Sequence, residues 1–327
     1  MDALPISEKT GLPFSSLHDG CSHSCGHDFE LAWGLMVAKY FAANPMKGCL
    51  RLIFQPAEEG PGAEPHGKTG GQLLHELGVF KADSIMSLHV EPELQLGNVS
   101  IAGGEVTCTA YDFEYVLTGK ASHAAKPHQG INPVPVAADL TRALLDLVAR
   151  LRADYASDED FVLLSVSDIA TQLSAGEKNT EGSVNTIPEL AFVRGITRVR
   201  GTTTQERLLA GLKEIEVRFA TGLKDCRLEL RHTAVATVND RAAVQHVVAA
   251  AAEFNIPVVA KRTTWRDDAG WASLSAASAH GFVGIDDGKP AALHSPDFIA
   301  NEGALPIGLK LFVSSLERRF SEGVQQR

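Results

Sequence analysis

The chain has 327 residues, of which 44% are hydrophobic and 21% charged, and it carries a net charge of −10. This is the composition of a globular protein with a large core and room for two domains. The acidic balance, with Lys and Arg scattered, excludes a nucleic-acid-binding surface, which needs a basic stripe. We expect no membrane contact and a cytoplasmic location, because the sequence lacks a long apolar stretch and a signal-peptide pattern.

Strands and helices alternate in the first hundred residues. Residues 29–44 are predicted to form an amphipathic helix, 49–55 a strand, 70–80 a helix and 84–90 a second strand. Such alternation is typical of an α/β fold with a doubly wound, mostly parallel sheet.

The order of elements changes near residue 111. The pattern then predicts a strand, a long helix, two strands, a helix and a strand, at 111–118, 133–153, 161–169, 190–199, 203–221 and 226–234. This β-α-β-β-α-β order is the ferredoxin-like signature, so we expect an inserted α+β domain at 106–232.

Alternation resumes after this inserted domain. Helices are expected at 241–254, 268–279 and 303–320, and strands at 256–261 and 281–285. Residues 1–105 and 233–327 are therefore predicted to form one discontinuous domain.

Five dispersed cysteines predict mostly free thiols in a reducing compartment. Cys49, Cys108 and Cys226 are expected to be buried and inert. Cys25 differs because His27 follows two positions later, so both side chains leave an extended segment on the same side. A thiolate and an imidazole are ligands of first-row metals, with zinc as the default.

Two adjacent carboxylates, Glu58 and Glu59, follow an apolar segment and precede Gly60-Pro61-Gly62. Neighbouring residues of a strand point to opposite faces, so both reach one site only where the strand ends and the backbone bends, which a Gly-Pro-Gly sequence permits. Open α/β sheets bind ligands at the carboxyl ends of their parallel strands. One carboxylate could bind a metal while its neighbour moves a proton; a solvated acidic loop is the alternative.

Two histidines complete the set of ligand-type residues. His89 ends an apolar strand at the same predicted sheet edge as Glu59, and His294 lies in a loop before the last helix. Each histidine alone is more typical of a structural residue. Only the combination of thiol, imidazoles and carboxylates indicates a metal centre.

Several different short motifs occur in order along nearly the whole chain. In order they are MDALPI at 1–6, HSCGHD at 23–28, RLIFQPAEEG at 51–60, LHV at 88–90, SHAAKPH at 122–128, NTIP at 185–188, LHSP at 293–296 and ALPIG at 304–308. Together they resemble the aminoacylase and carboxypeptidase superfamily of dinuclear metallopeptidases, in particular its amidohydrolase branch. The resemblance implies a metal-dependent enzyme that hydrolyses the amide bond of a small N-acyl amino acid or a related conjugate.

The resemblance also implies a role for each ligand-type residue. Two divalent ions (Zn, Mn, Co or Ni) would be held by Cys25, His27, Glu59, His89 and His294. Two ions can polarise a carbonyl and lower the pKa of a bridging water. Glu58 would be the general base, and Asp2 would hold a ligand imidazole in its tautomer.

The inserted domain is implied to act as a lid and to form a homodimer. His123 of one subunit would reach the other subunit's site and stabilise the oxyanion there. Asn185 and Arg198 would hold the carboxylate of the substrate. For Arg198, a solvated position on a strand is the alternative.

The chain departs from the family pattern in three places. Family members carry a segment before MDALPI with the first strands of the sheet, so we expect an exposed apolar edge unless the true protein is longer or the chain compensates. Trp265-Arg266-Asp267-Asp268 replaces a Gly-Ser-acid-Asp sequence, and Phe29-Glu30 replaces Gly-His. Substrate preference is therefore less transferable than mechanism.

Other classes of protein remain open. A catalytically impaired homologue would bind metal or ligand without turnover, and the Glu58→Gln variant separates this possibility from an enzyme. A Cys25 nucleophile would leave the other ligand-type residues without a role. A structural zinc site would need clustered pairs such as CxxC, which the sequence lacks.

Overall fold

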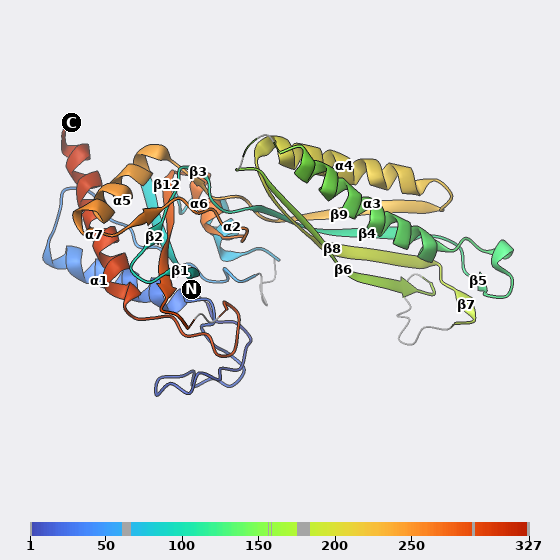
Figure 1. The fold of residues 1–327 in the computed structure, drawn as a ribbon, viewed down its shortest axis with the longest axis horizontal. Coiled ribbons are helices and arrows are strands. Elements are labelled where there is room, and N and C mark those ends of the chain that lie inside the picture. Colours follow the sequence, from blue (N-terminus) through green and yellow to red (C-terminus); the bar gives the residue numbers. More distant parts are fainter. Residues whose placement is uncertain are drawn as a thin grey trace. The chain divides into compact units, whose positions relative to one another are not determined.

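The computed structural model describes residues 2–60, 67–155, 157, 159–174, 184–289 and 292–325. The chain divides into two compact units, which Figure 1 shows as ribbons. Unit 1 consists of Met1–Thr107, Thr237–Thr263 and Asp267–Arg327. Unit 2 consists of Cys108–Ala236 and the short segment Thr264–Arg266.

Unit 1 contains a mixed sheet of six strands. These are β1 (Ser84–Gln95), β2 (Val99–Ser100), β3 (Gly104–Glu105), β10 (Val238–Asn239), β11 (Val258–Val259) and β12 (Ala277–Asp286). The two long strands, β1 and β12, pair in parallel at the centre. On its other side β12 pairs with β10 in parallel and with β2 in the antiparallel sense.

The described residues of unit 1 form five helices: α1 (His27–Ala43), α2 (Gly70–Glu76), α5 (Arg241–Glu253), α6 (Ala269–Ser273) and α7 (Ala304–Gln325). Helix α7 packs on α1, on α5 and on both long strands. The buried Trp33 of α1 lies in this core and donates a hydrogen bond from Nε1 to the Leu305 carbonyl, at 3.0 Å. Gly308 permits the close approach, because a Cβ there would lie 2.3 Å from the Trp33 ring.

Two predicted elements of unit 1 are wrong. Residues 49–55 form no strand, and among the described residues they have no ladder partner; they line a cavity of about 1410 Å³ together with Ser84–His89 of β1. The helix expected at 268–279 ends at Ser273, and its last three residues belong to β12. Cys49, expected to be buried, is exposed. Every helix among the described residues is too short or too polar to span a membrane.

Unit 2 is an antiparallel sheet of four strands covered on one face by two helices (Figure 1). Its elements are β4 (Thr109–Thr118), α3 (Pro133–Ala153), β6 (Phe161–Gln172), β8 (Leu190–Arg200), α4 (Thr202–Ala220) and β9 (Asp225–Ala234). The strand order β6-β8-β4-β9 is that of a ferredoxin-like fold. The α/β fold class with a separate α+β unit is confirmed.

The sequence explains unit 2 directly. The Asn132 side chain caps α3 by accepting the Val134 N–H at 3.1 Å, and Pro133 occupies the first turn, where its missing N–H costs nothing. Leu140, Leu144 and Leu147 then recur on one buried face. Strand β8 alternates buried and half-buried residues, as a half-covered sheet requires.

A two-stranded ribbon also belongs to unit 2. Strand β5 (Ser122–His123) pairs with β7 (Thr186–Ile187) in the antiparallel sense, with His123 opposite Thr186. The short helix η1 (Pro127–Gln129) follows β5. This ribbon carries two of the predicted site residues, His123 and Asn185.

Candidate metal centre

Four segments of unit 1 bring their ligand-type side chains together. They are the start of α1, the bend after residue 55, strand β1 and the loop before α7. Three groups have ligand atoms within 4.8 Å of one another: Cys25, His27 and His89; Cys25, Glu59 and His294; and His27, Glu58 and Glu59. Since the groups share members, all six side chains form one cluster, which we call the ligand cluster.

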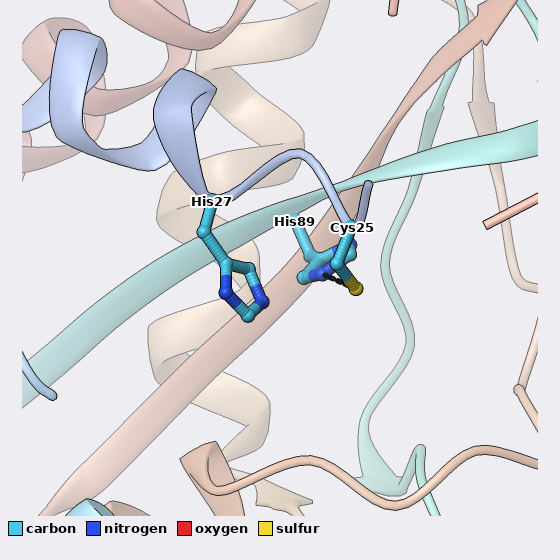
Figure 2. Close-up of side chains that lie close together, drawn as sticks. All are labelled: Cys25, His27 and His89. Atoms are coloured by element: carbon cyan, nitrogen blue, oxygen red, sulfur yellow. Dashed lines mark hydrogen bonds between the residues drawn. The ribbon is translucent and has the colours of Figure 1, made fainter. Parts of the chain in front are cut away.

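Gly26 determines how Cys25 and His27 face the same centre. Its φ of 82° is left-handed, and a Cβ there would lie 2.4 Å from Val90 Cγ2. Only glycine fits this position without strain. Figure 2 shows the result: the Cys25 side chain lies beside His89 of β1, and His27 is the first residue of α1. Cys25 Sγ lies 3.6 Å from His89 Nε2.

The buried imidazoles are oriented through their Nδ1 atoms. His89 Nδ1 lies 2.7 Å from the Val90 carbonyl, so Nδ1 donates and Nε2 keeps a lone pair for the cluster. His27 Nδ1 lies 3.4 Å from Asp2 Oδ1, while its Nε2 lies 3.6 Å from Glu58 Oε2. A carbonyl or carboxylate behind the ring is the usual arrangement for a metal-binding histidine.

A bend at Ala57 directs both glutamates to the cluster. Ala57 has a φ of 51°, which is uncommon for a residue with a Cβ. The Asp2 carboxylate accepts the backbone N–H of Glu58 at 3.2 Å and that of Glu59 at 3.1 Å. Glu59 Oε2 then lies 3.4 Å from Nε2 of the half-exposed His294. Asp2 therefore contacts both a histidine and the glutamate bend.

Burial and like charges raise the pKa of two groups in this cluster. Burial, with the charges of Glu59 and Glu58, raises the pKa of the Cys25 thiol. Burial, with Asp267 and Asp268, raises the pKa of Glu58 well above its ordinary value.

The two buried histidines respond in opposite ways. Burial lowers the pKa of His89 to about 4, which keeps this imidazole neutral. For His27, burial acts in the same direction but is outweighed by the hydrogen bond to Asp2 and by nearby carboxylates, which raise its pKa to about 9.

This donor set fits divalent metal ions. It offers a thiol, neutral or neutralisable imidazoles and carboxylates at short range, and the side chains crowd negative charge that cations would offset. Mixed sulfur, nitrogen and oxygen donors suit zinc and its first-row neighbours. Cys25, His27, Glu59, His89 and His294 could hold the ions, and Glu58 stands beside them.

Sequence reasoning missed one buried residue next to the cluster and left two others without a role. His280 of β12 was not singled out, although a histidine inside the apolar run 277–285 was a signal. Its Nε2 lies 3.4 Å from Asp267 Oδ2, and its Nδ1 lies 2.8 Å from Ser87 Oγ. Burial opposes ionisation of Asp267, yet His280 holds the pKa of that carboxyl below its usual range. Asp268 is also buried.

The predicted residues of unit 2 lie in two places. His123 and Asn185 are neighbours on the ribbon, where the Ala124 N–H donates to the Asn185 carbonyl at 2.8 Å. Arg198 lies toward the far end of β8, whose first residue, Leu190, follows the ribbon in sequence. At ~3.3 Å per residue, Arg198 is roughly 26 Å from Leu190. Within unit 2, therefore, Asn185 and Arg198 are not brought together. Arg198 is half-buried, and burial and the charge of Arg266 lower its pKa.

The fold and the donor set define a class, namely metal-dependent hydrolases with an α/β unit and a separate α+β unit. The model of Peptidase family M20/M25/M40 matches residues 1–318, and the chain belongs to this family. It is therefore a metal-dependent amidohydrolase of the M20 type, as the motifs predict.

Curated relatives share a name. The N-acetyldiaminopimelate deacetylase of Leuconostoc mesenteroides is 28% identical over 332 residues, which cover 99% of this chain and 80% of that protein. The enzyme of the same name from Listeria monocytogenes is 34% identical over 216 residues, covering 66% of this chain and 53% of the relative.

Solved structures share the fold. A protein of methicillin-resistant Staphylococcus aureus, described as an aminohydrolase, has a TM-score of 0.84 at 25% identity, with 98% of this chain and 79% of that chain covered. The YXEP protein of Bacillus subtilis, described as a dinuclear metal-binding peptidase, has a TM-score of 0.78 at 23% identity, with the same coverage.

Proposed function

We propose that the chain hydrolyses the amide bond of a small N-acyl amino acid. The observation that carries this proposal is the ligand cluster, with Glu58 Oε2 3.6 Å from the His27 ring that faces it. The curated relatives act, by name, on N-acetyldiaminopimelate. An acetylated amino acid with a further charged group is therefore the first substrate class to test.

Five residues would hold two divalent ions, and a sixth would move the proton. The proposed ligands are Cys25, His27, Glu59, His89 and His294. When bound, the ions would supply a polarised carbonyl and a more acidic water. Glu58 accepts a proton from that water while the water oxygen bonds to the acyl carbon. Glu58 then delivers the proton to the amide nitrogen as the C–N bond breaks. The raised pKa of Glu58 suits a group that both takes and returns a proton.

The Asp2 carboxylate would act as a support rather than as a ligand. It lies 3.4 Å from His27 Nδ1 and accepts two backbone N–H groups from the glutamate bend. Burial opposes its ionisation, but these hydrogen bonds hold its pKa below the usual range. A permanently charged Asp2 would keep the His27 Nε2 atom directed at the metal.

His123 would stabilise the negative charge that develops on the acyl oxygen in the partner subunit. The Ala125 N–H donates to His123 Nδ1 at 3.0 Å, so a neutral His123 carries its proton on Nε2. An exposed donor of this tautomer suits the role. Asn185, beside it, and Arg198 would contact the substrate carboxylate. Because unit 2 holds these two residues apart, they would come from different subunits.

We infer that this role is performed in a homodimer formed through unit 2. Strand β6 is an edge of the four-stranded sheet. Ile169 on this strand and Leu145 on α3 line one hollow, and each is about half-exposed (52% and 51%). Apolar side chains at a sheet edge favour pairing with another chain.

The test measures release of carboxylate and free amine from N-acetyldiaminopimelate and from other N-acyl amino acids. We expect chelation to abolish hydrolysis and added Zn, Mn, Co or Ni to restore it. The Glu58→Gln variant should retain its metal and lose about 100-fold or more in kcat, whereas Glu302→Gln, at an exposed position, should not. Hydrolysis that survives complete metal removal would contradict the proposal. A metal-loaded protein that hydrolyses none of the panel would instead be a binding protein.

A further inference from the structure

Asp268, at the start of α6, is hydrogen-bonded to two other segments that lie close to the proposed general base, Glu58. Only 2% of this residue is exposed. Its Oδ2 accepts hydrogen bonds from Gln55 Nε2 and from the Gly71 N–H, both at 2.8 Å. Its Oδ1 accepts a third from Thr69 Oγ1, also at 2.8 Å. The carboxylate thus ties the start of α6 to the segment before Glu58 and to the start of α2.

The backbone around Asp268 is shaped to allow this contact. A Cβ on Gly71 would lie 2.8 Å from the Asp268 carboxylate, and one on Gly70 would lie 1.7 Å from the Pro56 carbonyl. The Gly70 N–H also donates to the Ala57 carbonyl at 3.0 Å. Two glycines in succession therefore let α2 approach both Asp268 and the residues that lead into the bend.

The bend itself needs external support. Ala57 has a left-handed φ of 51°, a conformation that is unfavourable for a residue with a Cβ and persists only where its surroundings hold it. Asp2 holds the residues after Ala57 through the N–H groups of Glu58 and Glu59. Asp268 holds Gln55, two residues before Ala57, and Gly70 holds the carbonyl of Ala57 itself.

We propose that Asp268 is a positioning residue, which fixes the Gln55–Ala57 bend and so aims Glu58 at the ligand cluster. Its role for the reaction rests on the proposed function, but its hold on the bend does not. The Asp268 N–H also donates to Glu58 Oε1 at 3.4 Å, a bond that a change of the side chain leaves in place. The Asp268 carboxylate acts through Gln55 and through the start of α2. The Trp265-Arg266-Asp267-Asp268 sequence therefore carries one residue that fixes the position of Glu58 through hydrogen bonds to neighbouring segments.

The hydrogen-bond polarity permits a sharp test. Asp268→Asn leaves one acceptor oxygen for three donors, namely Gln55 Nε2, the Gly71 N–H and Thr69 Oγ1, and turns an NH2 group toward at least one of them. Gln55→Glu places two carboxylates in contact. The double variant Gln55→Glu/Asp268→Asn reverses the bond between these residues, with carboxylate and amide exchanged, and keeps the total charge of the pair. We therefore expect each single variant to be impaired and the double variant to recover part of the loss.

The first measurement is amide hydrogen exchange of the metal-free protein, followed by mass spectrometry. Exchange in residues 55–60 should be about tenfold faster in Asp268→Asn and slower again in the double variant. The control is Asp240→Ala, which removes a carboxylate that caps α5 elsewhere in unit 1. It should speed exchange in α5 and leave 55–60 unchanged. Unchanged exchange at 55–60 in Asp268→Asn would overturn the proposal, whether or not the chain proves to be an amidohydrolase.

The second measurement compares kinetics with metal content in protein that hydrolyses its substrate. Asp268→Asn should lower kcat by about tenfold or more, with KM and bound metal within about twofold of wild type. If Asp268 only stabilised the fold, metal content and active fraction would fall together, and kcat per metal-loaded molecule would not change. That result would overturn the positioning role. Failure of the proposed function appears separately, as a wild-type protein without hydrolysis.

Discussion

At the scale of single residues, three unusual backbone conformations position the ligand-type side chains. Gly26, Ala57 and His294 all have positive φ, at 82°, 51° and 62°. Each lies at, or directly beside, a proposed ligand or the proposed base. Strained backbone of this kind persists where surrounding contacts hold it and is concentrated at functional sites. The ligand cluster therefore depends on local turns as much as on the sheet.

Gly26→Ala tests this dependence. The added Cβ meets Val90 Cγ2 at 2.4 Å, so Cys25 and His27 must move apart from β1. We expect a loss of about 2–4 kcal/mol in the free energy of unfolding and a large loss of metal affinity. The matched control is Gly20→Ala, where φ is 78° and nothing lies within 4 Å of the new Cβ. Equal effects of the two variants on metal affinity would show that the Val90 contact is irrelevant.

Metal binding should release protons at neutral pH. Burial and the charges of Glu59 and Glu58 raise the pKa of the Cys25 thiol, so it is protonated in the metal-free protein at pH 7. A metal binds the thiolate, and the proton must leave, so metal affinity should rise about tenfold per pH unit for each proton released. Titration calorimetry in buffers of different ionisation enthalpy measures this number. Affinity that does not change between pH 6 and pH 8 would refute thiolate ligation.

At the scale of elements, the contact between α1 and α7 tests the core that supports the site. A Cβ on Gly308 would lie 2.3 Å from the Trp33 ring. Gly308→Ala should therefore lower the free energy of unfolding by about 1–3 kcal/mol, although alanine favours a helix. Urea unfolding measures the change. In combination with Trp33→Phe, the loss should be smaller than the sum of the single losses, because a smaller ring relieves the overlap. Strict additivity would contradict this packing.

Local sequence patterns predicted most elements because their signals are local. The helix at 133–153 has the same limits in the structure, since Asn132, Pro133 and a regular apolar face all act within the helix. Residues 49–55 were predicted as a strand from their apolar character, but a strand also needs a neighbour, and no local pattern reports one. The helix at 268–279 failed because residues 277–279 pair with β1, a long-range contact that overrides local preference.

The candidate site was predictable to a similar degree. The motifs that carry the resemblance single out Cys25 and His89, and the structure brings these side chains together. Their role as metal ligands stays a prediction. Asp268 and His280 were harder, because their importance comes from hydrogen bonds to segments some 190 to 210 residues away in sequence. A buried carboxylate cannot be distinguished from a surface one by its neighbours in the chain.

At the scale of the whole molecule, the proposed role of His123 makes a prediction about pairs of subunits. The Glu58→Gln and His123→Ala variants should each be nearly inactive alone. If His123 acts in the partner subunit, mixed dimers contain one intact site, and random mixing should restore about a quarter of wild-type activity. Refolding or co-expressing the two variants and measuring amide hydrolysis tests this. No recovery in verified mixed dimers would place His123 outside the partner's site.

We propose, above all, that unit 1 holds two divalent ions through Cys25, His27, Glu59, His89 and His294. The most direct test loads the purified chain with metal, removes unbound metal by dialysis and measures the bound metal by elemental analysis. The metal concentration divided by the protein concentration gives the number of ions per chain. We predict two ions per chain in the wild type, and clearly fewer in Glu59→Gln and His89→Ala, whereas Glu58→Gln keeps both. Wild-type protein that retains no metal, or a Glu59→Gln variant that binds as much as the wild type, would contradict the account.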